Sequence, residues 1–185
     1  MRKNRSLVPD YYFEKFSDAS CGFLVSIGVK GIVLDIDNTL EPYENPVPTE
    51  QVVAWFDSLA TAGIKAAFVS NNNAERVEMF NKNLEFPAYF KAGKPFKKNI
   101  LRALSDMGVT PSEAILMGDQ IFTDVCCAKR CGARAFLVPP IRDKQDFFTR
   151  FKRRLEKGIL RRFYKKHPDM PDIRKGSTIK YEETV

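Results

Sequence analysis

Histidine and long apolar runs are both scarce in this sequence, and their scarcity excludes several classes of protein. His167 is the only histidine, which excludes catalytic triads and phosphatases that work through histidine. The longest apolar stretch, Cys21–Val29, is about half of the roughly 20 residues that a membrane-spanning helix needs, and it contains a serine. We therefore expect no spanning helix.

The start of the sequence lacks the features of a secretory signal. Basic residues lead into Pro9 and Asp10, where a signal peptide would have an apolar core. A chain of 185 residues, 44% of them hydrophobic, is long enough for one domain with a full core. We expect a cytoplasmic protein whose thiols stay reduced, with peripheral association at a membrane as an open alternative.

Patterns that would centre the chemistry on cysteine or on a nucleotide-binding loop are also missing. Cys126, Cys127 and Cys131 share one expected helix without a fourth ligand nearby, so we interpret them as buried helix residues rather than as a zinc site. No cysteine precedes the glycine-rich loop and arginine of a cysteine-dependent phosphatase. Gly93-Lys94 is followed by proline instead of Ser or Thr, which excludes a P-loop.

Positive charge is concentrated in one segment. The net charge is +7, but residues 141–166 alone carry +8, from eleven basic and three acidic residues. Apolar residues recur there at intervals of three and four, which predicts a basic amphipathic helix: they are Phe148, Phe151, Leu155, Ile159 and Phe163. The helix could cover the sheet, bind an anionic membrane surface or bind nucleic acid, and we favour the first two over the third.

Short β-branched runs alternate with amphipathic helical stretches over residues 31–140. We expect strands at 31–36, 64–69, 88–91, 114–117 and 133–138, with helices at 49–62, 73–84, 95–107 and 124–131. This alternation predicts an α/β fold with a parallel sheet between helices. We expect residues 1–30 to pack on this core and residues 167–185 to form a flexible tail.

Polar side chains follow four of the expected strands. They are Asp35 and Asp37, then Ser70, then Lys94, and finally Asp119 and Asp124. Because the carboxyl ends of parallel strands meet at one edge of a sheet, these side chains should converge. Carboxylates, a hydroxyl and a lysine are the groups that phosphoryl transfer with Mg²⁺ requires.

Each residue type suits one part of that chemistry. A carboxylate can attack an anionic phosphate ester only where the repulsion is cancelled, which Mg²⁺ and Lys94 would do for Asp35. Asp119 and Asp124 would supply or orient the metal ligands, and Ser70 would donate a hydrogen bond to a phosphoryl oxygen.

Two carboxylates separated by one residue can take different roles. Asp35 would attack, whereas Asp37, if protonated, would donate to the leaving oxygen. Each motif by itself is weak, because Asp-x-Asp is common and Ser-Asn is often only a turn. Four motifs in order, each at a strand end, favour the functional interpretation over chance.

The set of motifs resembles the haloacid dehalogenase-like superfamily over roughly residues 31–139. The residues that carry the resemblance are Asp35-x-Asp37-x-Thr39, Ser70, Lys94 and Gly118-Asp119-x4-Asp124. The resemblance implies a Rossmannoid three-layer hydrolase. The gaps at 40–49 and 73–93 are too short to hold an inserted cap domain, so we expect an open, capless site that accepts large or interface-bound substrates.

The resemblance also implies roles for individual residues. Asp35 would form an aspartyl-phosphate and Asp37 would act as general acid and base, which favours a phosphatase. Mg²⁺ would be held by Asp35, by the main-chain carbonyl of Asp37 and by Asp119. Asn71 is expected at the phosphate with Ser70 and Lys94, whereas Thr39 and Asp124 are expected behind the metal ligands.

Within the superfamily the sequence is most similar to the YqeG-like branch of subfamily IIIA, which resembles phosphatidylglycerophosphate phosphatases. Residues 69–73, 118–124 and 147–150 carry this likeness, and Ala92-Gly93 departs from the larger or basic residue expected before the lysine. The resemblance implies a phosphomonoester substrate, with phosphatidylglycerophosphate or another lipid phosphate as our hypothesis. A phosphatase for nucleic-acid ends or small metabolites, and a non-catalytic scaffold that binds RNA or the ribosome, stay open.

Overall fold

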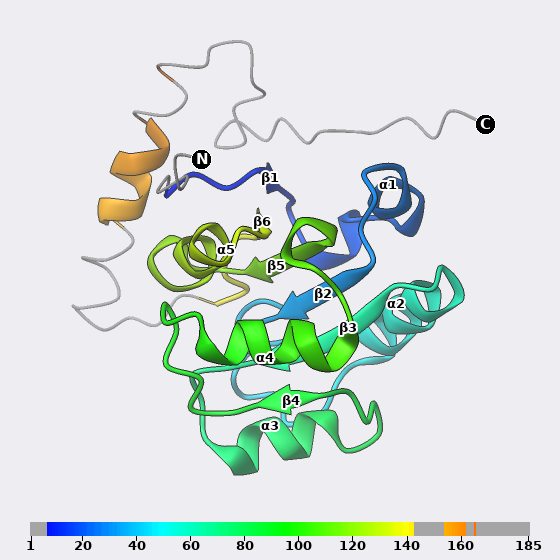
Figure 1. The fold of residues 1–185 in the computed structure, drawn as a ribbon. Helices are drawn as coiled ribbons and strands as arrows, with labels where there is room; N and C mark the ends of the chain where they lie inside the picture. The colour runs from blue at the N-terminus through cyan, green and yellow to red at the C-terminus, as the bar shows by residue number, and fades with distance from the viewer. Residues whose placement is uncertain (1–6, 143–153, 162–164, 166–185) are drawn as a thin grey trace.

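A parallel β-sheet lies at the centre of the molecule (Figure 1). The structure, a computed structural model, describes residues 7–142, 154–161 and 165. The strands within these residues are β1 (Tyr11–Tyr12), β2 (Gly31–Leu34), β3 (Lys65–Val69), β4 (Ala88–Tyr89), β5 (Ala114–Gly118) and β6 (Arg134–Leu137). Their order across the sheet is β1-β6-β5-β2-β3-β4, and all neighbours run parallel.

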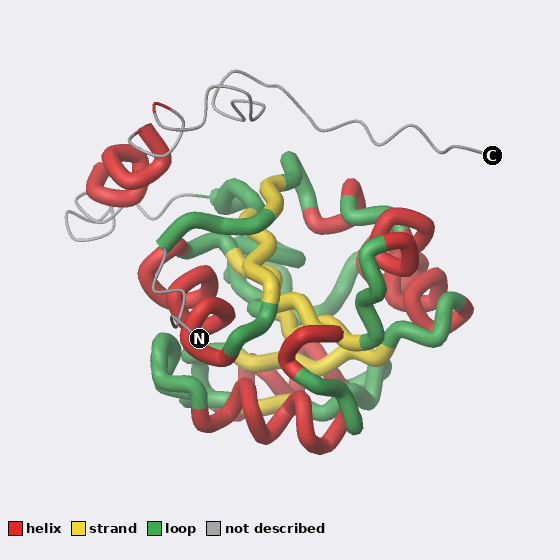
Figure 2. Tube along the Cα trace, turned by 45° about the horizontal axis from the view of Figure 1, so that its top comes forward, coloured by secondary structure: helices red, strands yellow, loops and turns green. Residues whose placement is uncertain are grey.

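Helices cover both faces of the sheet, and Figure 2 shows the yellow strands flanked by red helices. The helices are α1 (Cys21–Ser26), α2 (Glu50–Thr61), α3 (Ala74–Asn81), α4 (Lys98–Met107) and α5 (Cys126–Cys131), with single turns η1 (Phe16–Asp18), η2 (Pro111–Glu113) and η3 (Ile121–Val125). Buried residues of α1, α2 and α3 join one core cluster, and those of α4 and α5 join another. The expected three-layer α/β fold is confirmed.

The alternation of side chains along the strands explains why two cores form. Successive residues of a strand point to opposite faces. Ile32 and Leu34 of β2 therefore join the α1–α3 cluster, whereas Val33 joins the α4–α5 cluster, and all three are fully buried. Burying each such side chain contributes about 1.5–3 kcal/mol, which is why β2 reads as a continuous apolar run.

Some elements are shorter than the sequence predicts. Strand β2 ends at Leu34 instead of residue 36, because the N–H of Ile36 donates to Asp35 Oδ1 and so leaves the ladder. Helix α4 begins at Lys98 instead of residue 95, because Phe96 donates to the carbonyl of Gly93 in a preceding turn. Its expected end is confirmed, since Gly108 closes the helix in the left-handed conformation.

The N-terminal segment contributes β1, η1 and α1, which the sequence analysis did not predict. Strand β1 pairs with β6 at the edge of the sheet, and helix α1 follows it. Phe13, Phe23 and Leu24 of this segment are buried in the α1–α3 cluster. Strand β1 has two residues, which is too short for the alternation pattern to reveal.

Part of the expected basic helix contacts the domain. Residues 154–161 are helical, and Ile159 and Leu160 pack against the α4–α5 cluster. Leu155 stays 47% exposed, so the expected apolar stripe does not turn to the core as a whole. The rest of that helix and the expected tail at 167–185 lie outside the described residues. Among the helices that the structure does describe, none has the length and apolar character to cross a membrane.

The strand order creates a switch point beside β2. From β2 the chain continues to β3 and β4 on one side, and it then returns to place β5 and β6 on the other. Loops that leave the carboxyl ends of strands diverge at such a point, and open α/β sheets bind ligands there.

Candidate active site

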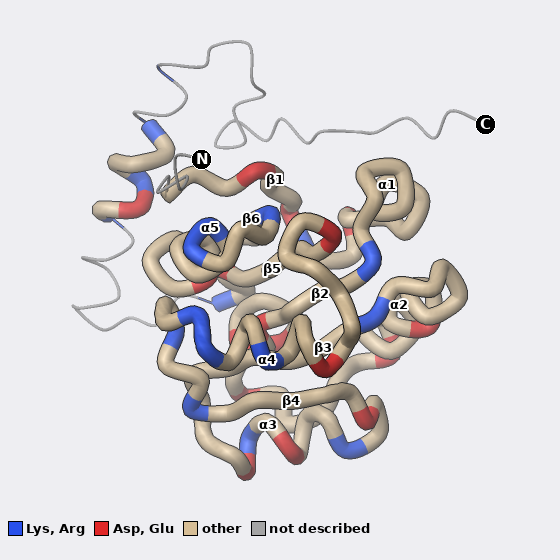
Figure 3. The backbone as a smooth tube through the Cα atoms, in the orientation of Figure 1, with Lys and Arg blue, Asp and Glu red and all other residues tan. Residues whose placement is uncertain are grey.

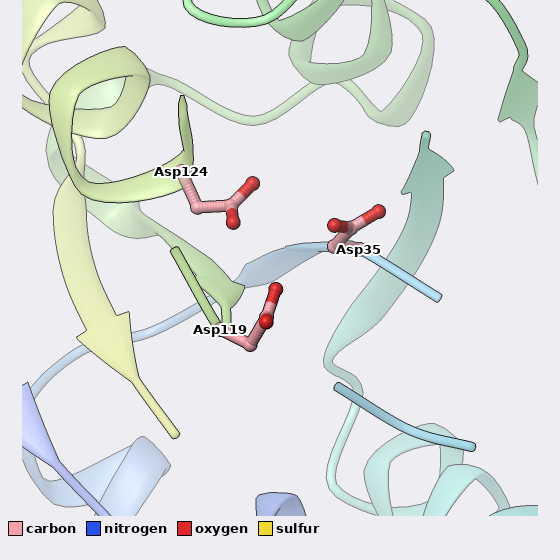
Figure 4. Close-up of side chains that lie close together, drawn as sticks. All are labelled: Asp35, Asp119 and Asp124. Carbon is pink, nitrogen blue, oxygen red and sulfur yellow. The ribbon is translucent and has the colours of Figure 1, made fainter. Parts of the chain in front are cut away.

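Three aspartates converge at the carboxyl edge of the sheet, as Figure 4 shows. Asp35 follows β2, whereas Asp119 and Asp124 follow β5, and one carboxylate oxygen from each lies within 4.8 Å of the others. All three side chains are buried. Oxygen donors at this spacing fit a hard divalent cation, which would supply the positive charge that buried carboxylates need.

Lys94 lies between two of these aspartates. Its Nζ is 2.7 Å from Asp124 Oδ1 and 3.0 Å from Asp35 Oδ1. Burial by itself would lower the pKa of Lys94, but the two carboxylates outweigh burial and raise it, so the lysine stays charged. The site therefore contains one fixed cation among three carboxylates.

The surroundings of Asp35 raise the pKa of its carboxyl group. This pKa is raised to about 7, because burial and the nearby charges of Asp124 and Asp119 raise it more than Lys94 lowers it. A carboxylate that is costly to ionise in this position gains from any cation that binds beside it.

The main chain of Lys94 is held by Asn71. The amide of Asn71 accepts a hydrogen bond from Lys94 N at 2.7 Å and donates one to Lys94 O at 3.3 Å. Asn71 thus holds the main chain of Lys94 in place. Its expected contact with phosphate stays a prediction. Ser70 is buried nearby, where its Oγ accepts from the N–H of Asn72 at 3.1 Å.

Asp37 points to a different set of partners. Its Oδ1 accepts from Arg76 Nε at 2.9 Å, and its Oδ2 accepts from Asn72 Nδ2 at 2.9 Å. Arg76 is itself buried and donates to the carbonyl of Pro46. In this conformation Asp37 is held as the anionic member of an ion pair, outside the group of three aspartates.

The two residues expected behind the metal ligands are both buried. Thr39 is buried in the loop after β2, and within the described residues its Oγ1 has no hydrogen-bond partner. Asp124 uses its Oδ2 to accept from Gln120 N and from Thr123 Oγ1, while its Oδ1 meets Lys94. Asp124 therefore stabilises its own loop with one carboxylate oxygen and pairs with Lys94 through the other.

Gly118 makes the position of Asp124 sterically feasible. A Cβ at residue 118 would lie 2.2 Å from Asp124 Cγ and 2.4 Å from its Oδ2. Such distances are far inside van der Waals contact, so any larger residue at 118 must displace the carboxylate. The glycine before Asp119 is thus required by the packing of Asp124 and not by backbone conformation.

Glu156 stabilises the loop that carries Asp119 and Asp124. Its Oε1 accepts from the N–H of Ile121 at 2.9 Å and from the N–H of Phe122 at 3.5 Å, and its side chain is buried. These N–H groups begin η3, where a helix has no backbone partners of its own. A residue of the C-terminal helix therefore caps the helix that contains Asp124.

Sequence reasoning missed Arg76 and Glu156, although each leaves a trace. Arg76 lies beside Val77 and four residues before Phe80 on the buried face of α3. Glu156 shares a face with Ile159 and Leu160 of the basic helix. A charged residue within an apolar stripe indicates a buried polar partner, but the sequence pattern does not show which residue that partner is.

Comparisons with known proteins find relatives over most of this chain. The model of the haloacid dehalogenase-like hydrolase family matches residues 33–138. The probable phosphatase YqeG of Bacillus subtilis is 37% identical over 153 residues, which are 83% of this chain and 89% of that protein. The chloroplastic/mitochondrial phosphatidylglycerophosphate phosphatase 1 of Arabidopsis thaliana is 30% identical over 149 residues, which are 75% of this chain but only 43% of that protein.

Two solved structures show the same fold at low sequence identity. The cobalt-bound deoxy-D-mannose-octulosonate 8-phosphate phosphatase of Haemophilus influenzae has a TM-score of 0.51 at 14% identity, covering 68% of this chain and 75% of that chain. CbbY from Rhodobacter sphaeroides in complex with phosphate has a TM-score of 0.50 at 15% identity, covering 65% and 90%.

The contact between Gly118 and Asp124 predicts the effect of Gly118→Ala. The added methyl group must displace the Asp124 carboxylate, so we expect a loss of about 1–3 kcal/mol in the free energy of unfolding, measured in urea. Gly22→Ala is the matched control, because a Cβ there has nothing within 4 Å and this variant should keep wild-type stability or gain slightly. Equal stability of the two variants would contradict the steric role of Gly118.

The pKa of Asp35 predicts how metal binding depends on pH. Because the folded-state pKa is raised to about 7, a proton competes with a cation for Asp35 below that pH and ceases to compete above it. The rise in Tm on adding Mg²⁺ should therefore be larger at pH 8 than at pH 6. In Asp35→Asn the difference between the two pH values should disappear, and its persistence would assign the competition to another group.

Proposed function

The chain belongs to the haloacid dehalogenase-like hydrolases as one of their phosphatases, and from this premise we propose that it hydrolyses phosphate monoesters through an aspartyl-phosphate on Asp35 with Mg²⁺ as cofactor. The observation that carries the proposal is the group formed by Asp35, Asp119, Asp124 and the buried Lys94. It combines a nucleophile with charges that can hold and neutralise a phosphate.

In the first step, an oxygen of Asp35 attacks phosphorus and the bond from phosphorus to the leaving oxygen breaks. Lys94 Nζ stabilises the negative charge of the phosphoryl oxygens, since it already lies 3.0 Å from Asp35 Oδ1. Asp35, Asp119 and the main-chain carbonyl of Asp37 would hold Mg²⁺, whose charge offsets the repulsion between carboxylate and phosphate. Water then hydrolyses the aspartyl-phosphate and restores Asp35.

Asp37 serves as general acid and base in this proposal. It would protonate the leaving oxygen in the first step and accept a proton from water in the second. In the conformation described its two carboxylate oxygens accept from Arg76 and Asn72, so the acid role requires Asp37 to leave these partners and to carry a proton to the leaving oxygen.

For the substrate we propose a lipid phosphate, phosphatidylglycerophosphate being the first to test. Two features support this choice. Within the described residues, the segment between β2 and α2 is a loop and the segment between β3 and β5 forms only α3, β4, α4 and η2, so neither forms a cap domain. The Arabidopsis relative also carries this activity in its name. A panel that adds nucleotides, sugar phosphates and phosphorylated nucleic-acid ends separates the alternatives.

Asp35→Asn should abolish turnover, because an amide is neither an anionic nucleophile nor a strong Mg²⁺ ligand. We expect kcat on p-nitrophenyl phosphate to fall by at least about 10³-fold, which corresponds to about 4 kcal/mol of transition-state stabilisation. Circular dichroism controls for folding. If Asp35→Asn kept activity close to that of the wild type, the covalent step would be refuted. If the wild type hydrolysed none of the phosphoesters tested, the alternative of a non-catalytic scaffold would be favoured.

Asp37→Asn should reduce activity according to the leaving group. Alkyl phosphates need a proton at the leaving oxygen, whereas p-nitrophenolate leaves without one, so kcat/KM, which reports formation of the aspartyl-phosphate, should fall at least about tenfold more for an alkyl phosphate. The ratio of the two kcat/KM values is the measurement. Equal losses on both substrates would contradict general-acid catalysis by Asp37.

A further inference from the structure

Several large exposed apolar side chains lie in the segments at the carboxyl edge of the sheet. Within the described residues they are Val25, Tyr43, Val47, Met79, Phe90, Phe96, Leu101, Ile141 and Leu155. Six of these lie at the carboxyl edge of the sheet: Tyr43, Val47, Phe90, Phe96, Ile141 and Leu155. We call these six residues the apolar rim. The other three lie on α1, α3 and α4.

Hydrogen bonds connect three parts of the apolar rim to loops of the site. Ile141 N donates to the carbonyl of Asn38, one residue after Asp37. Phe96 N donates to the carbonyl of Gly93, beside Lys94. Leu155 precedes Glu156, which caps the loop of Asp119 and Asp124. These three parts of the apolar rim are therefore joined to the loops of the candidate site.

Basic side chains accompany the apolar rim in the sequence. The exposed ones that directly follow or precede a rim residue are Lys91, Lys97, Arg142 and Arg154, and Lys98 lies one position further on. Figure 3 shows this charge in blue along the loop between β4 and α4 and at the start of α4. An acid, Glu44, follows Tyr43, and it lies 3.8 Å from Arg142 in an ion pair. Apolar side chains next to cations fit a partner that is apolar inside and anionic at its surface.

We propose that the apolar rim docks on an anionic lipid bilayer and so presents the site to phosphate groups at the membrane surface. The proposal rests on the proposed phosphatase function and deepens it by naming the partner. Phe96, which is 71% exposed, would enter the acyl boundary while Lys97 meets headgroups. A bilayer is favoured over nucleic acid because Val47, Ile141 and Leu155 gain from leaving water but cannot stack on bases.

The proposal fits the depth of the site. Asp35 is buried and Lys94 is 7% exposed, so a substrate phosphate must reach down between the loops. A docked rim would bring a lipid headgroup to that depth without removing the lipid from the bilayer. It would also replace the selectivity that a cap domain gives in an enclosed site.

Vesicle binding tests the proposal without requiring turnover. The full chain is sedimented with phosphatidylcholine vesicles that do or do not contain phosphatidylglycerol, and we expect binding to the anionic vesicles. Phe96→Ser should lower the partition coefficient by at least about tenfold, because burying one phenylalanine contributes that much. Met79→Ser, on α3 away from the apolar rim, is the matched control and should bind as the wild type does.

Three outcomes would overturn the proposal. The first is a wild type that ignores anionic vesicles at physiological salt, and the second is a Phe96→Ser variant that binds them equally well. The third is a wild type that prefers single-stranded RNA over vesicles and loses this binding in Phe96→Ser, which would assign the apolar rim to nucleic acid. Hydrolysis of p-nitrophenyl phosphate by the same samples reports on the proposed function separately, and Phe96→Ser should retain it.

Discussion

Mutual repulsion of buried carboxylates is the constraint on which the site depends. Asp35, Asp119 and Asp124 lie within 4.8 Å of one another where water is excluded, and Lys94 alone among the named site residues places a cation between two of them. Such an arrangement is costly for the folded chain unless further positive charge enters. The same cost favours the binding of a cation, so the repulsion among these carboxylates suits the metal-dependent chemistry proposed for them.

Residues around the site hold these charged side chains in place without being expected to contact the substrate. The amide of Asn71 fixes the main chain of Lys94 from both sides, and the bare backbone of Gly118 leaves space for Asp124. The carboxylate of Glu156 orders the first N–H groups of the helix that contains Asp124. These contacts join segments next to β3 and β5 and the C-terminal helix, so the geometry of the site depends on elements far apart in the sequence.

Residues next to strand ends could be predicted from the sequence, and residues that act across the fold could not. Asp35 and Asp119 follow apolar runs that identify β2 and β5, so the parallel sheet brings them together by geometry alone. Arg76 pairs with Asp37 across 39 positions, and Glu156 reaches Ile121 across 35. Neither pairing follows from periodicity, because it depends on how α3 and the last helix dock, and β1 was too short to leave a pattern.

The cap provided by Glu156 has a consequence for how this chain can be divided. A basic C-terminal segment would ordinarily count as an appendage that can be exchanged without effect on catalysis. Here one of its carboxylates completes the hydrogen bonding of Ile121 and Phe122, and Ile159 and Leu160 close the core beside α4 and α5. Residues 154–161 and the loop of Asp119 and Asp124 are therefore packed together, so a substitution in this part of the segment must preserve the geometry of that loop.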